Sequence, residues 1–470
     1  MAKKEKEKFK KDNNDRLKIP ILAVSDNIVF SKKEVWAYYK ISTVPFDFLS
    51  LDSKADLAER TVNALGALSA SEGKKVDGHI LITNTPLDVM SWVNQMDKAY
   101  TEWHPNQVFP DVYNKFIDEE SEELTAQGFQ RPIVYLGIRL FNRGSFDLDN
   151  FNVLEFGFHD AWKLIKEGIS NMFVLQDDQI DEFEDKRAHD AEAEIFRTLS
   201  TGNLNAKRVT SNEMLLTIKR RFYPSMPVPY LEVDHGTRFG TNDIVMETGG
   251  VIENNYRYLE FNQMIDGEEY EGYRATMSFA RFPKDLSMPG NHSPFLYMPA
   301  SQGLPYTMSA RFTMIPQTKV KKDLQKKKLD TDDEINNLAG SGQASNAHIE
   351  GTVRDLQELE DSLENNKLPW VSGAYRVTIE APTVEMLKSM ASQLKQDYAD
   401  NDTNIIWTSG DQLKLFLEEL PGGTLSSPSF NQMTNLAMLG VSGFNIGGNV
   451  GDPINEKLIL TERGDTDDAG

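Results

Sequence analysis

The stretch GFNIGGNV, residues 443–450, has the glycine spacing of a phosphate-binding loop. Such a loop reads G-x-x-x-x-G-K-[ST], because backbone N–H groups surround the phosphates while the Lys and the hydroxyl bind the outer phosphates and Mg²⁺. Here Asn449 stands at the Lys position and Val450 at the hydroxyl position. Pro453 follows closely and disfavours the helix N-terminus that a phosphate loop needs. We therefore interpret the stretch as a glycine-rich connector and expect no nucleotide cofactor there.

A second candidate for chemistry is the acidic segment that contains Asp177, Asp178, Asp181, Glu182 and Glu184. Neighbouring carboxylates can hold a divalent cation or carry out the acid–base steps of a hydrolase. The segment lacks the Gly that turns an EF-hand loop, and apolar residues recur in it at helical spacing. These are Ile180, Phe183, Ile195 and Phe196. An amphipathic helix with a solvated acidic face is the favoured interpretation, and a hydrolase or metal-binding enzyme is the alternative.

Other catalytic patterns are weak. The seven histidines are scattered, with no H-E-x-x-H and no close pair, so we expect no histidine-based metal site. Ser442 lies in G-x-S-G rather than in the G-x-S-x-G of a nucleophile elbow. The absence of Cys excludes disulfides, thiolate nucleophiles and zinc knuckles, and fits a reducing cytoplasm.

The chain has 470 residues and a formal net charge of −22, so we expect two or three domains and no direct sequence-specific binding of nucleic acid. No apolar run approaches the roughly 18 residues of a membrane span, and the first residues lack the apolar core of a signal peptide. The Lys-rich arm, residues 1–20, is interpreted as disordered and solvated. The alternative is an arm that lies on an anionic membrane surface.

Strand and helix patterns alternate along the first part of the chain. The bulky segment EVWAYYKISTVPF, residues 34–46, predicts a strand, and a helix at 53–71 follows. Further strands are expected at 76–83 and 132–141, with a helix that opens at Pro86 between them. A helix is also expected at 211–222.

Two later segments alternate strictly between apolar and polar residues, which predicts antiparallel strands with one buried face. In residues 272–282 the apolar set is Tyr273, Ala275, Met277 and Phe279. In residues 305–315 it is Tyr306, Met308, Ala310, Phe312 and Met314.

The last third begins with helical spacing over 318–366, interrupted by GSGQASN, which predicts a projecting helical hairpin with its tip near residues 340–345. Next we expect a strand at 373–381, a helix capped by Thr383, the strand NIIW and the helix DQLKLFLEELPGG. Together these patterns predict an α+β fold of mixed or antiparallel sheets layered with helices, plus the antiparallel hairpin. The expected divisions are 1–20 (arm), 21–205 (amino-terminal α+β domain), 206–316 (mainly β), 317–368 (hairpin), 369–425 (βαβα) and 426–470 (connector and tail).

Four of these segments carry a resemblance to a known family. With the hairpin, TVEMLKSMASQLKQDY and DQLKLFLEELPGG in that order, the chain resembles the amino-terminal region of the large conjugative-transfer ATPases of type IV secretion systems, especially the Gram-positive versions. The segment EVWAYYKISTVPFDFLS is similar to the start of that family. In the family a RecA-like motor with Walker motifs follows this region. Here the only Gly-Lys pair is Gly73-Lys74, with Leu68 at the first glycine position of a P-loop.

The resemblance implies a non-catalytic docking and assembly part of a conjugation machine carried by a mobile element such as a plasmid. It implies membrane channel subunits and a motor polypeptide, encoded elsewhere or lost, as partners. A homo-oligomer is also compatible with the family. The expected location is cytoplasmic and peripheral, at the inner face of the cell membrane. We expect Trp36, Tyr38 and Tyr39 to form an exposed aromatic docking cluster. The equally weighted alternative is that alternate members of this run fill the core of the sheet, since a strand must bury one face. We expect no catalytic residues, metal or cofactor.

Overall fold

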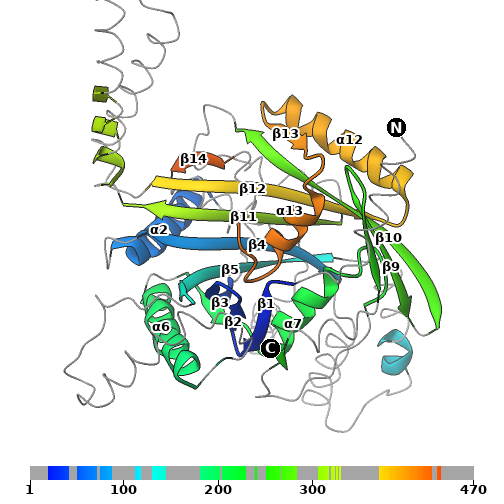
Figure 1. The fold of residues 1–470 in the computed structure, drawn as a ribbon, viewed down its shortest axis with the longest axis horizontal. Coiled ribbons are helices and arrows are strands. Elements are labelled where there is room, and N and C mark those ends of the chain that lie inside the picture. Colours follow the sequence, from blue (N-terminus) through cyan, green and yellow to red (C-terminus); the bar gives the residue numbers. More distant parts are fainter. Residues whose placement is uncertain are drawn as a thin grey trace, which may run out of the picture.

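The computed structural model describes residues 19–41, 50–70, 75–86, 112–117, 130–143, 180, 182–201, 204–228, 239–240, 250–265, 267–282, 305–316, 319–329 without 323 and 327, 370–425, and 431–435. This part of the chain has an α+β fold, as the sequence predicted, built on one large sheet with helices packed on it (Figure 1). Outside the described residues lie residues 1–18 of the arm, the three aspartates of the acidic segment, most of the expected hairpin and the stretch 443–450.

The sheet has 14 strands in the order β7-β1-β2-β3-β5-β4-β11-β12-β10-β9-β8, with β6, β13 and β14 pairing beside β3, β10 and β12. Every pairing among the described strands is antiparallel. The strands are β1 (Ile21–Ser25), β2 (Ile28–Ser31), β3 (Glu34–Ile41), β4 (Val76–Pro86), β5 (Gln130–Asn142), β6 (Ala206–Arg208), β7 (Phe239–Gly240), β8 (Val251–Asn254), β9 (Leu259–Ile265), β10 (Glu268–Arg281), β11 (Tyr306–Ile315), β12 (Trp370–Ala381), β13 (Asn404–Trp407) and β14 (Asn431–Asn435).

The helices follow the sequence patterns closely. They are α2 (Leu51–Ala70), α6 (Glu182–Thr201), α7 (Ser211–Arg220), α12 (Val384–Asp400) and α13 (Gln412–Glu419). Thr383 caps α12 as predicted, because its side chain accepts a hydrogen bond of 3.3 Å from the N–H of Met386. Pro86, at which a helix was expected to open, is itself the last residue of β4 and pairs with Gln130 of β5. The rest of that expected helix lies outside the described residues.

The two halves of the chain join in the middle of the sheet through the pairing of β4 with β11, where Ile82 lies opposite Met308. The ranges 21–205, 206–316 and 369–425 all contribute strands to this sheet. These sequence divisions therefore do not mark separate sheets.

One face of the sheet, which we call the apolar face, is covered by α2, α12 and part of α6. Its buried side chains include the two alternating sets that the sequence predicted, Ala275, Met277 and Phe279 from β10 and Tyr306, Met308, Ala310, Phe312 and Met314 from β11. Leu65 of α2 and Leu394 of α12 pack into the same cluster, and both side chains are fully buried. Alternation along the strands thus places the main core where it was expected.

The opposite face, which we call the polar face, is buried as well. Its strand positions carry polar residues, yet Arg274, Thr276, Thr307, Ser309 and Arg311 are all at most 5 % exposed. The helices α7 and α13 lie on this side, where Phe416 of α13 contacts aromatic rings from neighbouring segments (Figure 1). The prediction that these strands bury only one face is therefore wrong, because the C-terminal helix covers the side that alternation assigned to solvent.

The packing of α12 on the apolar face predicts a large difference between two positions of that helix. Leu394→Ala should lower the free energy of unfolding by about 2–5 kcal/mol, since it leaves a cavity in the core. Met386→Ala, at a side chain 50 % exposed, should change it by less than about 0.5 kcal/mol. Urea unfolding followed by circular dichroism measures both. Equal losses in the two variants would contradict the packing of α12.

Candidate functional site

The segment LEELPGG, residues 417–423, lies on the polar face and is clasped there by side chains from three strands. Tyr38 of β3 accepts a hydrogen bond of 2.8 Å from the N–H of Gly422, and Ser31 of β2 donates to the carbonyl of the same glycine. Arg311 of β11 donates to the carbonyl oxygens of Glu418 and Leu420, each at 2.8 Å. We call this arrangement the clasp.

The clasp requires its two glycines. The N–H of Gly423 donates to the carbonyl of Leu420 at 2.8 Å, and Gly422 has φ +73°, so Leu420–Gly423 has the residue types and geometry of a type II turn with proline in second place. A Cβ atom on Gly422 would lie 2.5 Å from Oγ of Ser31. A Cβ atom on Gly423 would lie 2.1 Å from the carbonyl oxygen of Leu417. Any side chain at either position would therefore open the turn.

Beneath α13 a buried carboxylate meets two buried arginines. Glu419 is paired with Arg274 and lies 3.5 Å from Arg221, and the hydroxyl of Thr378 donates to it at 2.7 Å. Burial alone would raise the pKa of Glu419, but the charges of Arg274 and Arg221 outweigh burial, so the pKa is lowered. Glu419 is thus held as a carboxylate in the interior and offsets part of the positive charge of the polar face.

A second buried chain of hydrogen bonds links Ser309, His79 and Tyr38. His79 Nε2 lies 2.9 Å from Oγ of Ser309, and His79 Nδ1 lies 3.0 Å from the Tyr38 hydroxyl. The other groups around that hydroxyl, the N–H of Gly422 and the guanidinium of Arg311, are donors. The Tyr38 proton is therefore donated to Nδ1, and Nε2–H is donated to Ser309.

This tautomer decides what the trio can do. A Ser–His pair hydrolyses esters only when the imidazole nitrogen accepts the serine proton. Here that nitrogen carries its own proton, and both side chains are buried at 3 % exposure or less. Burial, together with the charges of Arg311 and Arg221, also lowers the pKa of His79 well below its ordinary value. The trio acts as a structural support for the clasp.

The aromatic cluster predicted for docking is not exposed. Trp36 is 3 % exposed, and Tyr38 and Tyr39 are fully buried, so the expectation of an accessible cluster is wrong. Tyr39 stacks on Phe196 on the apolar face, whereas Tyr38 belongs to the clasp on the other side. These aromatic residues instead fill the core of the sheet. All three are buried, because both faces of β3 are covered.

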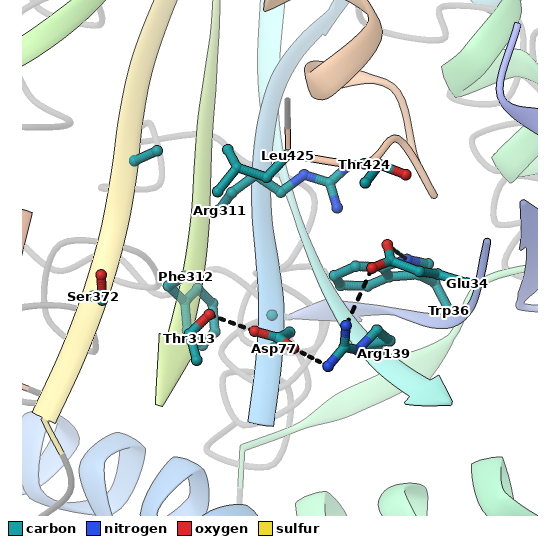
Figure 2. A pocket seen from close by; sticks show the side chains of 12 residues that line it. Glu34, Trp36, Asp77, Arg139, Arg311, Phe312, Thr313, Ser372, Thr424 and Leu425 are labelled. Carbon is teal, nitrogen blue, oxygen red and sulfur yellow. Dashed lines mark hydrogen bonds and ion pairs between the residues drawn. The ribbon is translucent and has the colours of Figure 1, made fainter. Parts of the chain in front are cut away.

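A pocket of about 210 Å³ opens beside the clasp at one end of the polar face. Arg139 bridges two carboxylates in it, donating to Glu34 at 3.1 Å and pairing with Asp77 (Figure 2). Arg311 lines another side of the pocket, with its guanidinium carbon 4.9 Å from the ring centre of Trp36. This cavity contains charged groups and hydroxyls, and it is the candidate binding site.

The acidic segment is placed only in part. Glu182 and Glu184 belong to α6, which confirms a helix there, and Glu184 accepts two hydrogen bonds from Arg143, at 2.6 and 3.0 Å. Asp177, Asp178 and Asp181 lie outside the described residues. Among the residues that the structure does describe, no group of three His, Asp or Glu side chains is placed to hold a metal ion.

Sequence reasoning missed the residues that build the polar face, because polar positions of alternating strands were assigned to solvent. One signal was available. Strands β10, β11 and β12 each carry an arginine with Ser or Thr at alternate positions, as in Arg274-x-Thr276-x-Ser278. When three neighbouring strands each carry an arginine with alternating Ser or Thr, these side chains are expected to meet in one buried polar layer and not to face solvent.

The ion pair beneath α13 generates a stability prediction. Glu419→Gln should lower the free energy of unfolding by about 3–5 kcal/mol, because it leaves two buried arginines without their carboxylate. Glu385→Gln, at an exposed position of α12, is the matched control and should change it by less than about 0.5 kcal/mol. Urea unfolding at pH 7 measures both, and a loss below about 1 kcal/mol for Glu419→Gln would contradict a buried pair.

The lowered pKa of His79 predicts a pH dependence with a definite sign. The folded protein keeps His79 neutral, whereas the unfolded chain binds a proton as pH falls below about 6.5. The free energy of unfolding should therefore fall by up to about 1.4 kcal/mol per pH unit below that value from this residue alone. His79→Gln should remove this part of the slope in urea titrations between pH 7.5 and 5. His189→Gln, at a side chain 41 % exposed, is the matched control, and an unchanged slope in His79→Gln would contradict the assignment.

A scan against protein-family models finds no match, and neither does a search of curated proteins. The resemblance to conjugation ATPases therefore depends on the segments quoted above, and the function has to be argued from the geometry of the clasp and of the pocket beside it.

Proposed function

We propose that this chain is a non-catalytic docking and assembly part of a conjugative type IV secretion ATPase. In this proposal it links channel components at the membrane to a motor polypeptide during DNA transfer. The basis is the resemblance of four segments to the amino-terminal region of that family, together with the way in which two of those segments meet in the fold.

The observation that carries the proposal is the hydrogen bond between Tyr38 and Gly422, 384 residues apart in sequence. Tyr38 belongs to EVWAYYKISTVPF, and Gly422 belongs to DQLKLFLEELPGG. These are the first and the last of the quoted segments, and a resemblance by chance gives no reason for them to touch. Because the two segments touch, the resemblance to the family covers one folded unit and not only short, separate stretches of sequence.

The clasp also suits a protein that holds two partners in a fixed relative position. It holds the turn at residues 420–423 to β2, β3 and β11, so the direction in which the chain leaves α13 is fixed relative to the sheet. Farther on, β14 pairs with β12, with Trp370 opposite Asn435. A partner bound to this sheet would therefore be rigidly connected to whatever is attached beyond the clasp.

The chemistry of the described residues favours assembly over hydrolysis. Ser309 faces an imidazole nitrogen that already carries a proton, and Glu419 is occupied by two arginines. Glu184 is likewise engaged by Arg143. Each of these groups supports its neighbours in the fold and leaves no base or nucleophile free to act on a substrate.

For the location, we propose a peripheral position at the inner face of the cell membrane, reached through protein partners. None of the helices in the described part of the chain is both long and apolar enough to cross a membrane. The formal net charge of −22 disfavours recruitment by an anionic lipid surface alone. Channel subunits are therefore the proposed recruiting partners.

Cell fractionation tests the proposal. In cells that carry the conjugation genes, the protein should sediment with membranes when the channel subunits are present and remain in the supernatant when they are deleted. A deletion of residues 3–11, which removes six of the seven lysines of the arm, should leave this pattern unchanged.

Two results would contradict the proposal. Protein that stays in the supernatant although the channel subunits are present would remove the docking role. Membrane association that survives without the subunits but disappears with the arm would show that lipid electrostatics recruits the chain.

A further inference from the structure

Three strands at one end of the sheet have a side that is open to solvent. They are β8, β9 and the first half of β10, which pair side by side. Leu259, Phe261 and Ile265 of β9 point to the polar face and are buried there. The alternate positions point the other way, where Val251 is 58 % and Met264 69 % exposed. These strands are therefore held in place by packing on one side and are uncovered on the other.

The uncovered side is acidic. We call it the acidic patch, and it comprises Val251, Glu253, Glu260, Met264, Glu269 and Glu271. Glu253 and Glu260 lie directly opposite each other in the ladder of β8 and β9. Like charges at opposite positions lower the stability of a sheet. The fold thus retains a repulsive pair that a cation from outside would relieve.

The donors that the described residues supply to these carboxylates are neutral. The side-chain amide of Asn255 donates to Glu260 at 3.4 Å, and the hydroxyl of Tyr273 donates to Glu271 at 3.1 Å. Arg257 lies over the ring of Trp407 instead, with its guanidinium carbon 5.8 Å from the ring centre. The carboxylates of the patch consequently keep their charge for a partner.

Two tyrosine rings adjoin the acidic patch. Tyr273 lies opposite Glu260 in the ladder of β9 and β10, and Tyr258 packs against it with the ring centres 6.0 Å apart. Burial, the hydrogen bond to Glu271 and the charge of Glu260 raise the pKa of Tyr273 to about 12. The ring is therefore neutral at pH 7, and a cation held by Glu260 would lie beside an aromatic surface.

The combination of negative charge and apolar surface restricts the occupant. The carboxylates repel a nucleic acid, an anionic lipid surface and the same patch on a second copy of the chain. A metal ion is not favoured, since no group of three His, Asp or Glu side chains in the described part of the chain is placed to hold one. A Lys or Arg side chain fits both features, because its aliphatic stem covers apolar surface while its charged head reaches a carboxylate.

We propose that the acidic patch binds a segment of a protein partner that carries Lys or Arg residues. The charged heads of the segment pair with Glu253, Glu260 and Glu271, and the aliphatic stems lie on Val251 and Met264. The inference rests on the patch alone and stands whether or not the chain serves conjugation. If it does, the patch is one contact surface for the docking proposed above.

Fluorescence anisotropy with the full chain and a labelled peptide of alternating Lys and Ala around a central Leu tests the proposal. At low salt the peptide should bind the wild-type protein. The double variant Glu260→Gln/Glu271→Gln should bind it about five- to tenfold more weakly, because two charge pairs are lost. Met264→Ala should weaken binding about twofold or more, because the stems lose apolar contact.

The matched control is Glu59→Gln/Glu194→Gln, at two exposed positions of α2 and α6 away from β9 and β10 (Figure 1). It changes the net charge of the chain by the same amount and should bind the peptide like the wild type. Equal weakening in the two double variants would show attraction to the total negative charge and would overturn the proposal. A peptide that does not bind the wild type would overturn it as well.

Thermal unfolding of each variant shows whether it is folded. If Glu260→Gln/Glu271→Gln does not fold, Glu253→Gln takes its place, since it removes one charge of the repulsive pair. Glu253→Gln should weaken peptide binding about two- to fivefold, and unchanged binding would contradict the site.

Two measurements identify other occupants. A deletion of residues 3–11 that tightens peptide binding by about tenfold or more would assign the acidic patch to the Lys-rich arm of the same chain. A dimer in analytical ultracentrifugation that dissociates in Glu260→Gln/Glu271→Gln would assign it to a second copy. Either result would overturn the assignment to a protein partner.

Discussion

The burial of arginine on the polar face is the constraint on which the rest of this structure depends. Arg221, Arg274 and Arg311 are each at most 5 % exposed, and a guanidinium removed from water must find acceptors within the protein. Several of the acceptors come from one short segment. Glu419 supplies a carboxylate to Arg221 and Arg274, and the carbonyl oxygens of Glu418 and Leu420 accept from Arg311. Arg221 also donates to Thr307, and Arg274 also donates to the carbonyl oxygen of Arg221.

This constraint makes the sheet dependent on a segment that arrives late in the chain. The apolar face is a conventional core in which α2 and α12 pack against alternating strand residues. The polar face depends on α13 and the turn at 420–423, because Glu419 balances the buried charges of Arg221 and Arg274 and the carbonyl oxygens of the clasp accept from Arg311. Strands from both halves of the chain and the C-terminal segment therefore form a single interdependent unit, and we expect them to unfold together.

The same arrangement explains why the candidate site lies where it does. The clasp uses Nε and Nη2 of Arg311, and the same residue lines the cavity beside the clasp. The residues that hold the fold together thus also shape the pocket.

The sequence alone determined the α+β class, most of the helices and strands, and the apolar face, because alternation and helical periodicity are local properties that record which side of an element avoids water. It also indicated the Thr383 cap, which depends on neighbouring residues only. The tertiary structure alone decided the fate of the other face. Arg274, Ser309 and Arg311 carry no local sign that a helix more than one hundred residues away covers them. The burial of Trp36 and Tyr38 follows from the same distant contact, whereas Tyr39 is buried against Phe196 on the apolar face. A polar residue in an alternating strand is predicted to face solvent. Only the long-range packing shows that the clasp, and not water, provides hydrogen-bond partners for these side chains.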